Sequence, residues 1–576
     1  MERTGAQIIV ESFKREDVKA VFGYPGGAVL DLFDQFYKEN VPFFLTRHEQ
    51  GAIHAADGYA RASGNVGVCV ATSGPGGTNL VTGLATANMD SIPIVAITGQ
   101  VPTKLIGNDA FQEADITGIT RPITKHNYIV QTTDELPRIL KEAFHIARTG
   151  RPGPVLIDVP KDVQQNSSSI KYPRSIKISG YKTILSGHKN QLQKLAELLE
   201  NCKKPIIYAG GGVISSGASK ELVTFAKTQQ IPVTTTLMGL GVFPEEDDLS
   251  LRMLGMHGTQ YANKAIMEAD LIIAIGARFD DRITGKVEAF APDANIAHID
   301  IDPSTIRKNV KVDIPVVGDV KMVLNELLQL VKPRKHTDWL NKIRQWKVKY
   351  PLKYHQNGKI KPQYVVEKIY ELTHGNAIVA TEVGQNQMWA AQYYQFSQPR
   401  TFLSSGGLGT MGYGLPAALG AQIAHPNKTV FNIAGDGSIQ MNIQELATAA
   451  SYGLPVKIAI LNNGYLGMVR QWQELFYDER YSATCMNRQI KCPPHCNGKG
   501  DGVDCPPFIP DFVAVAEAYG ITGIRVMESK QVVPALKKAL EIDGPVLIEF
   551  MVDKKANVYP MVPSGAALDQ MLEGMA

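Results

Sequence analysis

The fold is indicated most strongly by residues 429–464, TVFNIAGDGSIQMNIQELATAASYGLPVKIAILNNG. The two apolar runs of this stretch predict strands that end at Asp436 and Asn462, and the segment between them predicts a helix with Gly453 as its C-terminal stop. The runs lack polar alternation, which is typical of parallel strands buried on both faces. We therefore expect one βαβ unit, with Asp436 and Asn463 at the carboxyl ends of neighbouring strands, where open α/β sheets bind ligands.

Asp436 and Asn463 carry the kind of oxygen atoms that Mg²⁺ binds. The glycines beside them leave room for phosphate oxygens to complete the coordination of the ion. The alternative is an Asp-Gly turn and an Asn-Gly turn that merely cap two strands. A lone GDG would favour that alternative, but the pairing of GDG with NN at βαβ spacing favours a magnesium site.

Alternating apolar runs and amphipathic stretches recur in three blocks of the chain. The fold class that they predict is α/β, with three successive doubly wound parallel sheets. The first block spans residues 1–165, the second 185–331 and the third 363–552. A polar segment with Ser and Pro, around 164–182, indicates a linker, and the basic segment 332–362 indicates a helical connector. Residues 553–576 form a tail that we expect to lie over the active site.

The composition of the 576 residues is that of an ordinary globular protein, with 44% hydrophobic residues, 20% charged residues and a mean hydropathy of −0.10. A disordered or fibrous protein is excluded. The net charge of +3 is too small to indicate a nucleic-acid or membrane-surface partner. No apolar run approaches the ~20 residues of a membrane span, and the N-terminus lacks a signal-peptide core. We expect a cytoplasmic protein, or a stromal one if the gene is plastid-encoded.

The GDG and NN motifs resemble the diphosphate–Mg²⁺ fingerprint of the thiamine-diphosphate enzymes. This resemblance implies that Asp436 and Asn463 are Mg²⁺ ligands and that the backbone carbonyl of Tyr465 is a third. It also places Gly437 among the cofactor-binding residues, together with Ser73 of the motif SGPGGTNL.

The first block contains RHEQGA (47–52) followed by DGYAR (57–61), which is similar to the pyrimidine-binding segment of the same family. The resemblance makes Glu49 the acid that hydrogen-bonds the aminopyrimidine ring of the cofactor. That chemistry needs a partly desolvated acid, because the amino group of the ring removes the C2 proton of thiamine once N1′ is protonated. Alone, Glu49 would be better explained as an acid that complements the dipole of a first helical turn.

The two cofactor-binding ends lie in different blocks. In the family they come from different subunits, so the resemblance implies a homodimer or a higher homo-oligomer.

Longer motifs extend the resemblance over almost the whole chain, among them GYPGGAVLDLFD, RPGPVLIDVPKDVQ, GARFDDRITG, VGQNQMWAAQ and LGMVRQWQELF. They are similar to the large subunits of the acetohydroxyacid synthase (acetolactate synthase) family. Such enzymes decarboxylate pyruvate on thiamine diphosphate and ligate the hydroxyethyl group to pyruvate or 2-ketobutyrate, in valine, leucine and isoleucine biosynthesis. The resemblance implies thiamine diphosphate, Mg²⁺ and FAD as cofactors and a separate small regulatory subunit as partner.

Two residues fit the demands of the second substrate. Arg282 would bind the acceptor carboxylate, because a guanidinium offers paired donors; its alternative is a salt bridge to Asp280 or Asp281. Trp472 would supply an apolar wall that favours an ethyl over a methyl group, a discrimination limited to about 1–3 kcal/mol; its alternative is a place in the core. Resemblance alone assigns active-site, channel or thiamine-cradling positions to Gly27, Phe111, Gln112, Lys161, Val383, Met411 and Met468.

The second block carries Gly- and Asp-bearing strand ends that are plausible but unspecific for nucleotide binding, and the AGGG after KPIIY is a weak dinucleotide signal. The resemblance turns this block into a site for FAD, which in the family is structural rather than a stoichiometric redox partner. It implies that the site is lined by Arg151, His257, Arg278, Asp300 and Asp319.

The chain departs from the family pattern at ATCMNRQIKCPPHCNGKGDGVDCPPFI, residues 483–509. The four cysteines of this insert, Cys485, Cys492, Cys496 and Cys505, suit a Zn²⁺ or iron–sulfur clip chemically. The spacing lacks a C-x2-C pair, which favours a reduced surface loop instead. We expect the insert to border the active-site entrance, because it closely follows Trp472.

Two other enzyme functions and a non-catalytic role are the alternatives to the interpretation as a ligase. A flavin-dependent pyruvate oxidase could be built on the same three blocks, but RFDDR and MVRQWQ favour the ligase. Glyoxylate carboligases lack the glutamate, so Glu49 argues against them. A non-catalytic paralogue is disfavoured by the presence of Glu49, Asp436 and Asn463 together.

Overall fold

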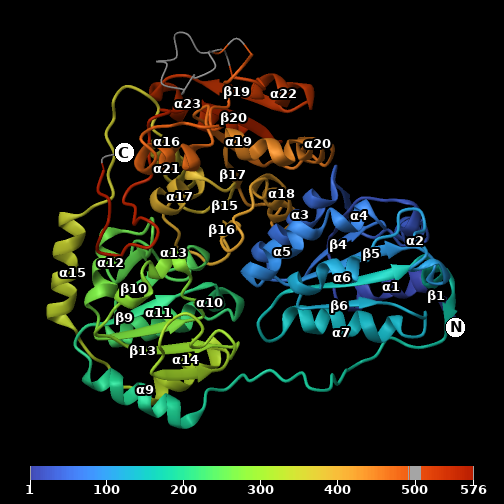
Figure 1. Cartoon of the computed structure of the whole chain (residues 1–576), viewed down its shortest axis with the longest axis horizontal. Coiled ribbons are helices and arrows are strands. Elements are labelled where there is room, and N and C mark those ends of the chain that lie inside the picture. The colour runs from blue at the N-terminus through green and yellow to red at the C-terminus, as the bar shows by residue number, and fades with distance from the viewer. Residues whose placement is uncertain (1, 491, 493–507, 575–576) are drawn as a thin grey trace.

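The computed structural model describes residues 2–490, 492 and 508–574. It contains three six-stranded sheets, all parallel, with helices on their faces (Figure 1). The first block (blue), the second (green) and the third (gold to red) occupy the corners of a triangle. The predicted fold class, α/β with three doubly wound parallel sheets, is confirmed.

The sheet of the first block has the strand order β3-β2-β4-β5-β7-β6. Its strands are β2 (Val21–Gly23), β3 (Phe43–Leu45), β4 (Gly67–Ala71), β5 (Ile94–Gln100), β6 (His126–Ile129) and β7 (Pro154–Pro160). Its helices are α1 (Gly5–Arg15), α2 (Leu30–Glu39), α3 (Glu49–Ser63), α4 (Pro75–Thr78), α5 (Val81–Asp90), α6 (Ile116–Thr120), α7 (Leu136–Arg148) and α8 (Lys161–Gln165). The short strands β1 (Arg3–Thr4) and β8 (Ser167–Ser168) pair antiparallel and join the two ends of the block.

The sheet of the second block has the strand order β11-β10-β9-β12-β13-β14. Its strands are β9 (Pro205–Ala209), β10 (Val233–Thr235), β11 (Ser250–Met253), β12 (Leu271–Ile275), β13 (Asn295–Asp300) and β14 (Ile314–Val317). Its helices are α9 (Lys189–Asn201), α10 (Gly211–Ser215), α11 (Ser219–Gln229), α12 (Gln260–Glu268), α13 (Asp281–Thr284) and α14 (Val320–Leu330). The basic connector forms α15 (Thr337–Lys349), as predicted.

The glycines of the AGGG motif have a packing role. A Cβ atom at Gly276 would lie 2.6 Å from Cα of Gly212, and one at Gly210 would lie 2.3 Å from the carbonyl oxygen of Gly276. The turn after β9 therefore packs backbone to backbone on the end of β12. This close approach explains Gly210 and Gly212 without a dinucleotide.

The sheet of the third block has the strand order β16-β15-β17-β18-β20-β19. Its strands are β15 (Ile378–Thr381), β16 (Phe402–Leu403), β17 (Val430–Gly435), β18 (Lys457–Asn462), β19 (Thr522–Val526) and β20 (Val546–Met551). Its helices are α16 (Pro362–Thr373), α17 (Gln385–Tyr393), α18 (Gly414–Ala424), α19 (Asp436–Ile439), α20 (Leu446–Ser451), α21 (Gly467–Phe476), α22 (Phe512–Ala518) and α23 (Ser529–Glu541). No helix in the described ranges is long and apolar enough to cross a membrane.

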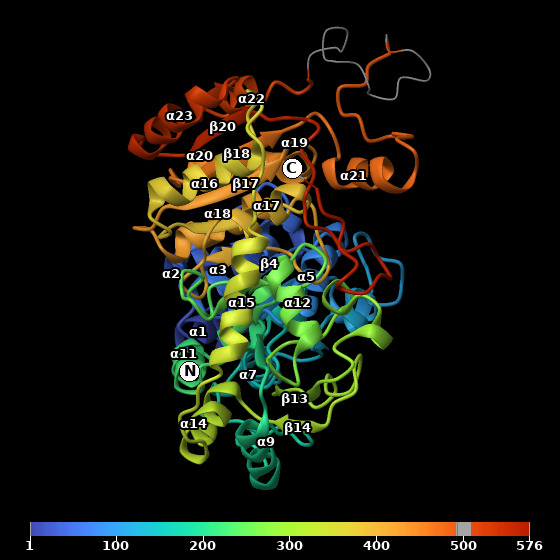
Figure 2. The same ribbon diagram turned by 90° about the vertical axis from the view of Figure 1, so that its left-hand side faces the viewer.

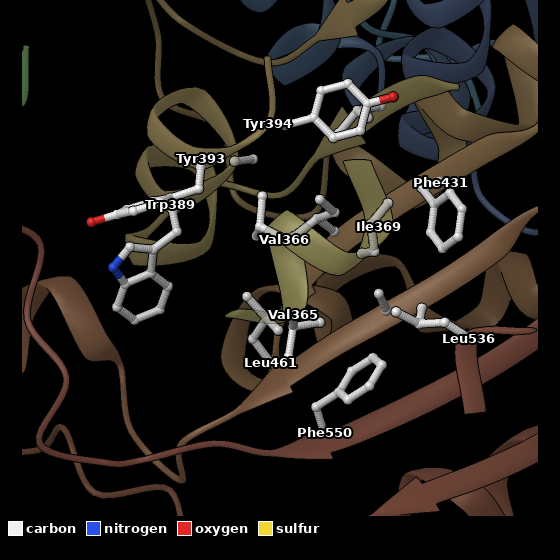
Figure 3. Close-up of a cluster of buried hydrophobic side chains, with 14 of the residues drawn as sticks. Val365, Val366, Ile369, Trp389, Tyr393, Tyr394, Phe431, Leu461, Leu536 and Phe550 are labelled. Atoms are coloured by element: carbon white, nitrogen blue, oxygen red, sulfur yellow. The ribbon is translucent and has the colours of Figure 1, made fainter. Parts of the chain in front are cut away.

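The core of the third block shows why its sequence folds in layers (Figure 3). Val365, Val366 and Ile369 share one face of α16 and pack against Phe431 of β17 and Leu461 of β18. All five side chains are buried. Full burial of a side chain of this size contributes about 1.5–3 kcal/mol, so this face holds the helix on the sheet.

The predicted helix between β17 and β18 is present but divided. A 3₁₀ segment, Gln440–Glu445, precedes α20, and Asn442 within it has φ −137° and ψ 31°. The side-chain amide of Asn442 donates to the carbonyl oxygen of Gly412 at 2.7 Å, which fixes the break. Gly453 follows the end of α20 with φ +57°, a conformation suited to glycine.

The first and third blocks are joined by α3 and α18. A Cβ atom at Gly420 would lie 1.9 Å from the carbonyl oxygen of Ala55, and one at Gly58 would lie 2.1 Å from that of Ala417. The two helices therefore touch through their backbones, because glycine on each removes the side chain that would separate them.

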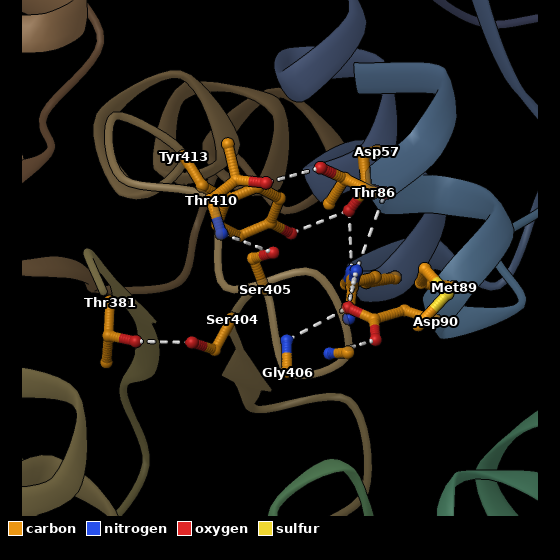
Figure 4. A network of polar contacts seen from close by, with 12 residues as sticks. Asp57, Thr86, Met89, Asp90, Thr381, Ser404, Ser405, Gly406, Thr410 and Tyr413 are labelled. Atoms are coloured by element: carbon orange, nitrogen blue, oxygen red, sulfur yellow. Dashed lines mark hydrogen bonds and ion pairs between the residues drawn. The ribbon is translucent and has the colours of Figure 1, made fainter. Parts of the chain in front are cut away.

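A buried polar network supports the same junction (Figure 4). Arg61 bridges Asp57 and Asp90, and the hydroxyl of Tyr413 donates to Asp57 at 2.6 Å. Asp90 in turn accepts the backbone N–H groups of residues 406 and 407 at 3.0 and 2.7 Å. The loop 404–412 of the third block is thereby fixed to the first block.

Gly420→Ala tests the helix junction. The added methyl group has no space beside Ala55, so we expect a loss of about 1–3 kcal/mol and a midpoint of thermal unfolding lowered by several degrees. Gly211→Ala is the control, since its Cβ atom would meet other atoms only at 3.5 Å. Equal midpoints for the two variants would contradict the close packing of α3 on α18.

Candidate active site

Asp436 and Asn463 lie at one edge of the third sheet, as predicted. β17 and β18 are neighbouring parallel strands with Gly435 opposite Leu461, so the residues that follow both strands emerge side by side. Asp436 is 2% exposed, and among the described residues its Oδ2 atom has no hydrogen-bond partner. Burial raises the pKa of Asp436 to about 7, against the backbone N–H groups of Asn463 and Gly464, which act to lower it. A buried carboxylate oxygen without a partner is costly, and a cation bound there would satisfy it.

The side chain of Asn463 is held by its neighbours. Its Oδ1 atom accepts the backbone N–H of Tyr465 at 2.9 Å, and its Nδ2 atom donates to Oε1 of Gln385 at 3.3 Å. An amide oxygen has two lone pairs, so one remains for a cation. The structure thus places Asp436, Asn463 and Tyr465 in one loop region, and it adds Gln385, which the sequence analysis missed.

The thiamine-cradling candidates of the third block surround this edge. A Cβ atom at Gly437 would lie 2.6 Å from Cδ2 of Leu466 and 4.0 Å from Cε of Met411. A Cβ atom at Gly409 would lie 3.9 Å from Cγ1 of Val383. Met468, the fourth candidate, is half-buried at the start of α21 and packs against the hydrophobic core of the third block. A side chain at position 437 would fill the space between Met411 and Leu466, which explains the glycine.

Glu49 is the first residue of α3, so its place in a first helical turn is confirmed. Its Oε2 atom accepts a hydrogen bond from Nδ2 of Asn79 at 2.9 Å. Thr72 and Gly76 lie beside it: a Cβ atom at Gly76 would lie 2.8 Å from Cγ2 of Thr72 and 3.6 Å from Oε1 of Glu49. Ser73 follows Thr72 and is buried. Asn79 had no distinctive sequence signal, because asparagine is common at such a helix junction.

The remaining candidates of the first block gather at the carboxyl edge of its sheet. Lys161 begins α8, and Gln164 of the same helix donates to the carbonyl oxygen of Ala28 at 2.8 Å, next to Gly27. Gly27 is exposed, and no other atom lies within 4 Å of where its Cβ would be. Gln112 is exposed with φ +60°, and Phe111 is 88% exposed.

Arg282 of the second block and Trp472 of the third meet. The guanidinium carbon of Arg282 lies 6.0 Å from the centre of the Trp472 ring, the geometry of a cation–π contact. The alternative ion pair is present but loose, with Nε of Arg282 3.7 Å from Oδ2 of Asp281 and side chains 53% and 79% exposed. Such a pair contributes little to stability. Trp472 is half-buried and faces Arg282, so it is not a core residue.

The tail reaches this place through buried glutamines. Nε2 of Gln385 donates to Oε1 of Gln471 at 2.8 Å, and Gln471 exchanges two hydrogen bonds with the backbone of Val558, at 3.0 and 2.8 Å. The tail then runs from the third block to the second (Figure 2), where its residues 562–565 line a small pocket with Met256 and Arg282. Gln471 lies in the quoted motif LGMVRQWQELF, but its role was missed, because its partners are distant in the chain.

The FAD candidates fall into two groups. Arg151 donates to Oγ of Ser91 at 2.8 Å and lies 3.4 Å from Oδ2 of Asp302, whose backbone N–H bonds Asp300 at 2.8 Å. Arg278 donates to the carbonyl oxygen of Met89 at 2.9 Å. Arg151, Arg278 and Asp300 therefore lie where the second block faces the end of α5.

The other two FAD candidates are Asp319 and His257. The carboxylate of Asp319 caps α14 by accepting the N–H groups of Lys321 and Met322 at 3.0 and 3.2 Å. His257 is buried, its Nδ1 atom has no partner among the described residues, and burial lowers its pKa to about 4. Burial raises the pKa of Asp300 to about 6.

The insert begins against the magnesium-site loop. Tyr465 forms a β-bridge with Cys485, and the N–H of Met486 donates to the carbonyl oxygen of Gly464 at 2.8 Å. Cys492 is a free thiol, while Cys496 and Cys505 lie outside the described residues. No cluster of three or more His, Cys, Asp or Glu side chains suited to a metal ion occurs in the described part of the chain. The metal clip stays a prediction.

Comparison with known proteins assigns the family. Three family models match the chain: thiamine pyrophosphate enzyme, N-terminal TPP binding domain, over residues 3–119; central domain, over 192–327; and C-terminal TPP binding domain, over 382–550. The acetolactate synthase large subunit of Corynebacterium glutamicum is 50% identical over 98% of this chain and 89% of its own length. That of Haemophilus influenzae is 48% identical over 99% and 98%, and the isozyme 3 large subunit of Escherichia coli is 46% identical over the same shares. The chain belongs to the acetolactate synthase large-subunit family of thiamine pyrophosphate enzymes.

Proposed function

We propose that this enzyme decarboxylates pyruvate and ligates the hydroxyethyl group to a second 2-ketoacid, pyruvate or 2-ketobutyrate, in the biosynthesis of valine, leucine and isoleucine. The observation that carries the proposal is the contact of Arg282 with Trp472 beside the tail. A cation and an apolar ring in contact suit the carboxylate and the alkyl group of a 2-ketoacid acceptor. The names of the relatives favour this ligase over a flavin-dependent pyruvate oxidase.

Mg²⁺ and thiamine diphosphate fit the edge of the third sheet. The Oδ2 atom of Asp436, which no described residue bonds, would hold the ion together with the amide oxygen of Asn463 and the carbonyl of Tyr465. Gly437 leaves space beside Met411. When bound, thiamine diphosphate supplies an electron sink for decarboxylation. Glu49, oriented by Asn79, would donate a proton or a hydrogen bond to the pyrimidine ring.

The residues around Arg282 act on the second substrate. Arg282 would bind the carboxylate of the acceptor and so orient the acceptor. Trp472 would contact the alkyl group of the acceptor and keep water away. Gln471 holds the tail against α21, so the tail would help to close the site. Gln112 and Lys161 belong to the first block and would reach the site from there.

FAD is proposed for the face between the second block and α5. Two guanidinium groups, of Arg151 and Arg278, suit phosphate oxygens, and the buried Asp300 suits a hydroxyl group. The buried Nδ1 atom of His257 has no partner among the residues that the structure describes, and a bound group would satisfy it. Asp319 would contribute only through its backbone neighbourhood, because its carboxylate caps α14.

We infer that the working unit is a homodimer or a higher homo-oligomer. In the described chain the one hydrogen bond to the carboxylate of Glu49 comes from Asn79, within its own block. Phe111, beside the site candidate Gln112, is 88% exposed, and Leu30 near Gly27 is 57% exposed. Large apolar side chains exposed next to a site suit an interface with a second copy. The naming of relatives as large subunits supports a separate small regulatory subunit as partner.

Glu49→Gln tests the acid. An amide cannot deliver the proton, so we expect acetolactate formation from pyruvate with thiamine diphosphate, Mg²⁺ and FAD to fall about 10²–10⁴-fold. The thermal midpoint should stay near that of the parent. Glu39→Gln, a surface change in the same block, should leave the rate unchanged. A Glu49→Gln enzyme within twofold of the parent rate would refute the role.

Trp472→Leu tests acceptor selection. With pyruvate and 2-ketobutyrate in competition, the product ratio should shift toward acetolactate by about tenfold or more, since one methylene is worth about 1–3 kcal/mol in an apolar pocket. Trp346→Leu, on α15, is the matched control. An unchanged product ratio in the Trp472 variant would show that the ring does not select the acceptor.

A further inference from the structure

Glu382 is a buried carboxylate for which the proposed reaction has no role. It directly follows β15, precedes Val383 and is 0% exposed. Its Oε2 atom accepts the backbone N–H of Gly412 at 2.8 Å and the hydroxyl of Ser438 at 3.0 Å. Its Oε1 atom accepts the backbone N–H of Leu415 at 3.0 Å. Both oxygens are therefore used inside the protein.

These partners belong to the segments that line the coenzyme end of the third block. Gly412 follows Met411, and Ser438 follows Gly437. A Cβ atom at Gly414 would lie 2.6 Å from the backbone nitrogen of Glu382, so the chain after Met411 also packs directly on Glu382. One carboxylate thus joins the Met411 loop, the Gly437 turn and the strand end before Val383.

The loop 404–412 has a second support that does not reach the Gly437 turn. Asp90 of the first block accepts the N–H groups of residues 406 and 407, and Thr86 bonds Thr410 at 2.7 Å between hydroxyls. These contacts hold the outer part of the loop (Figure 4). Glu382 holds its inner end through Gly412 and joins that end to Ser438. The N–H of Gly412 also donates to Oγ of Ser438 at 3.3 Å, so Glu382 and Ser438 hold the same N–H group from two sides.

A carboxylate is needed because every partner is a donor. Glutamate offers two acceptor oxygens, whereas the amide of glutamine offers one and adds two N–H donors. Glutamine would therefore lose either the hydrogen bond from Leu415 or the two hydrogen bonds that Oε2 accepts. It would also leave a buried N–H group of its own without a partner. Burial raises the pKa of Glu382, while the N–H groups of Leu415 and Gly412 and the hydroxyl of Ser438 act to lower it. The dipole of α18 at its N-terminus also favours the charged form.

We propose that Glu382 is a positioning residue: its carboxylate sets the separation between the Met411 side chain and the Gly437 turn, and so determines how tightly thiamine diphosphate is held. It acts through these two segments and not by contact with the coenzyme. The inference rests on the proposed function.

The test compares Glu382→Gln with Glu16→Gln. Glu16 is also a buried carboxylate, with Lys141, Arg148 and Tyr172 as partners, but it lies in the first block away from the site. Titration calorimetry with thiamine diphosphate and Mg²⁺ and near-ultraviolet circular dichroism of the bound coenzyme supply readouts that do not need turnover. We expect Glu382→Gln to weaken coenzyme binding by about tenfold, to change the dichroism and to lower kcat, with Glu16→Gln like the parent in all three.

Coenzyme affinity, dichroism and kcat equal to the parent in Glu382→Gln would overturn the proposal. Parallel losses in both variants would also overturn it, because they would reflect stability alone. If Glu382→Gln does not fold, Glu382→Asp keeps the charge with a shorter reach and should show the same changes to a smaller degree. A parent protein that binds the coenzyme but forms no acetolactate would refute the proposed function and leave the binding comparison valid.

Discussion

The parallel pairing of β17 with β18 is the constraint on which the site depends. It brings Asp436 and Asn463 to one edge of the third sheet, and it buries Asp436 so that one carboxylate oxygen lacks a partner in the described chain. A parallel pair exposes side chains from both strand ends on the same side, which an antiparallel pair would not do. Polar side chains around this edge then hold its loops in place. Gln385 bonds the side chain of Asn463, and Glu382 bonds the backbone N–H of Gly412.

One sheet edge can hold only one end of an extended coenzyme. The acid needed at the other end, Glu49, begins α3 on the first sheet, where Asn79 and Thr72 surround it. α3 is rigidly packed against α18 of its own chain through Gly58 and Gly420. The proposal that a second copy of the chain completes the site is supported by the exposed side chain of Phe111.

Local patterns predicted much of the fold because buried parallel strands and amphipathic helices carry their own periodicity. The places of Asp436, Asn463 and Glu49 followed from strand ends and a helix start, and the structure has them there. The break at Asn442 was not predicted, since it depends on a hydrogen bond to Gly412 from another loop.

The supporting residues of the site were also missed because they depend on contacts between distant parts of the chain. Asn79, Gln385 and Gln471 lie within quoted motifs, but their partners, like those of Glu382, are far away in the sequence, so the motifs do not show what these side chains bond. The AGGG glycines were ambiguous for the opposite reason: their pattern suits either a nucleotide or a close packing of two turns, and only the contact of Gly212 with Gly276 distinguishes these. The contact of Arg282 with Trp472 joins two blocks and was not predicted, because the two residues are distant in the sequence and only their separate roles were expected.

The measurement that tests the account most directly is the activity of a mixed dimer. Glu49→Gln and Asp436→Asn chains, each inactive alone, are co-expressed with different tags, and the dimer that carries both tags is isolated. If each site takes Glu49 from one subunit and Asp436 from the other, one of the two sites is intact and the mixed dimer should have about half the parent activity. If the mixed dimer is as inactive as the Glu49→Gln and Asp436→Asn homodimers, both ends of the site come from one chain, and the shared site proposed here is wrong.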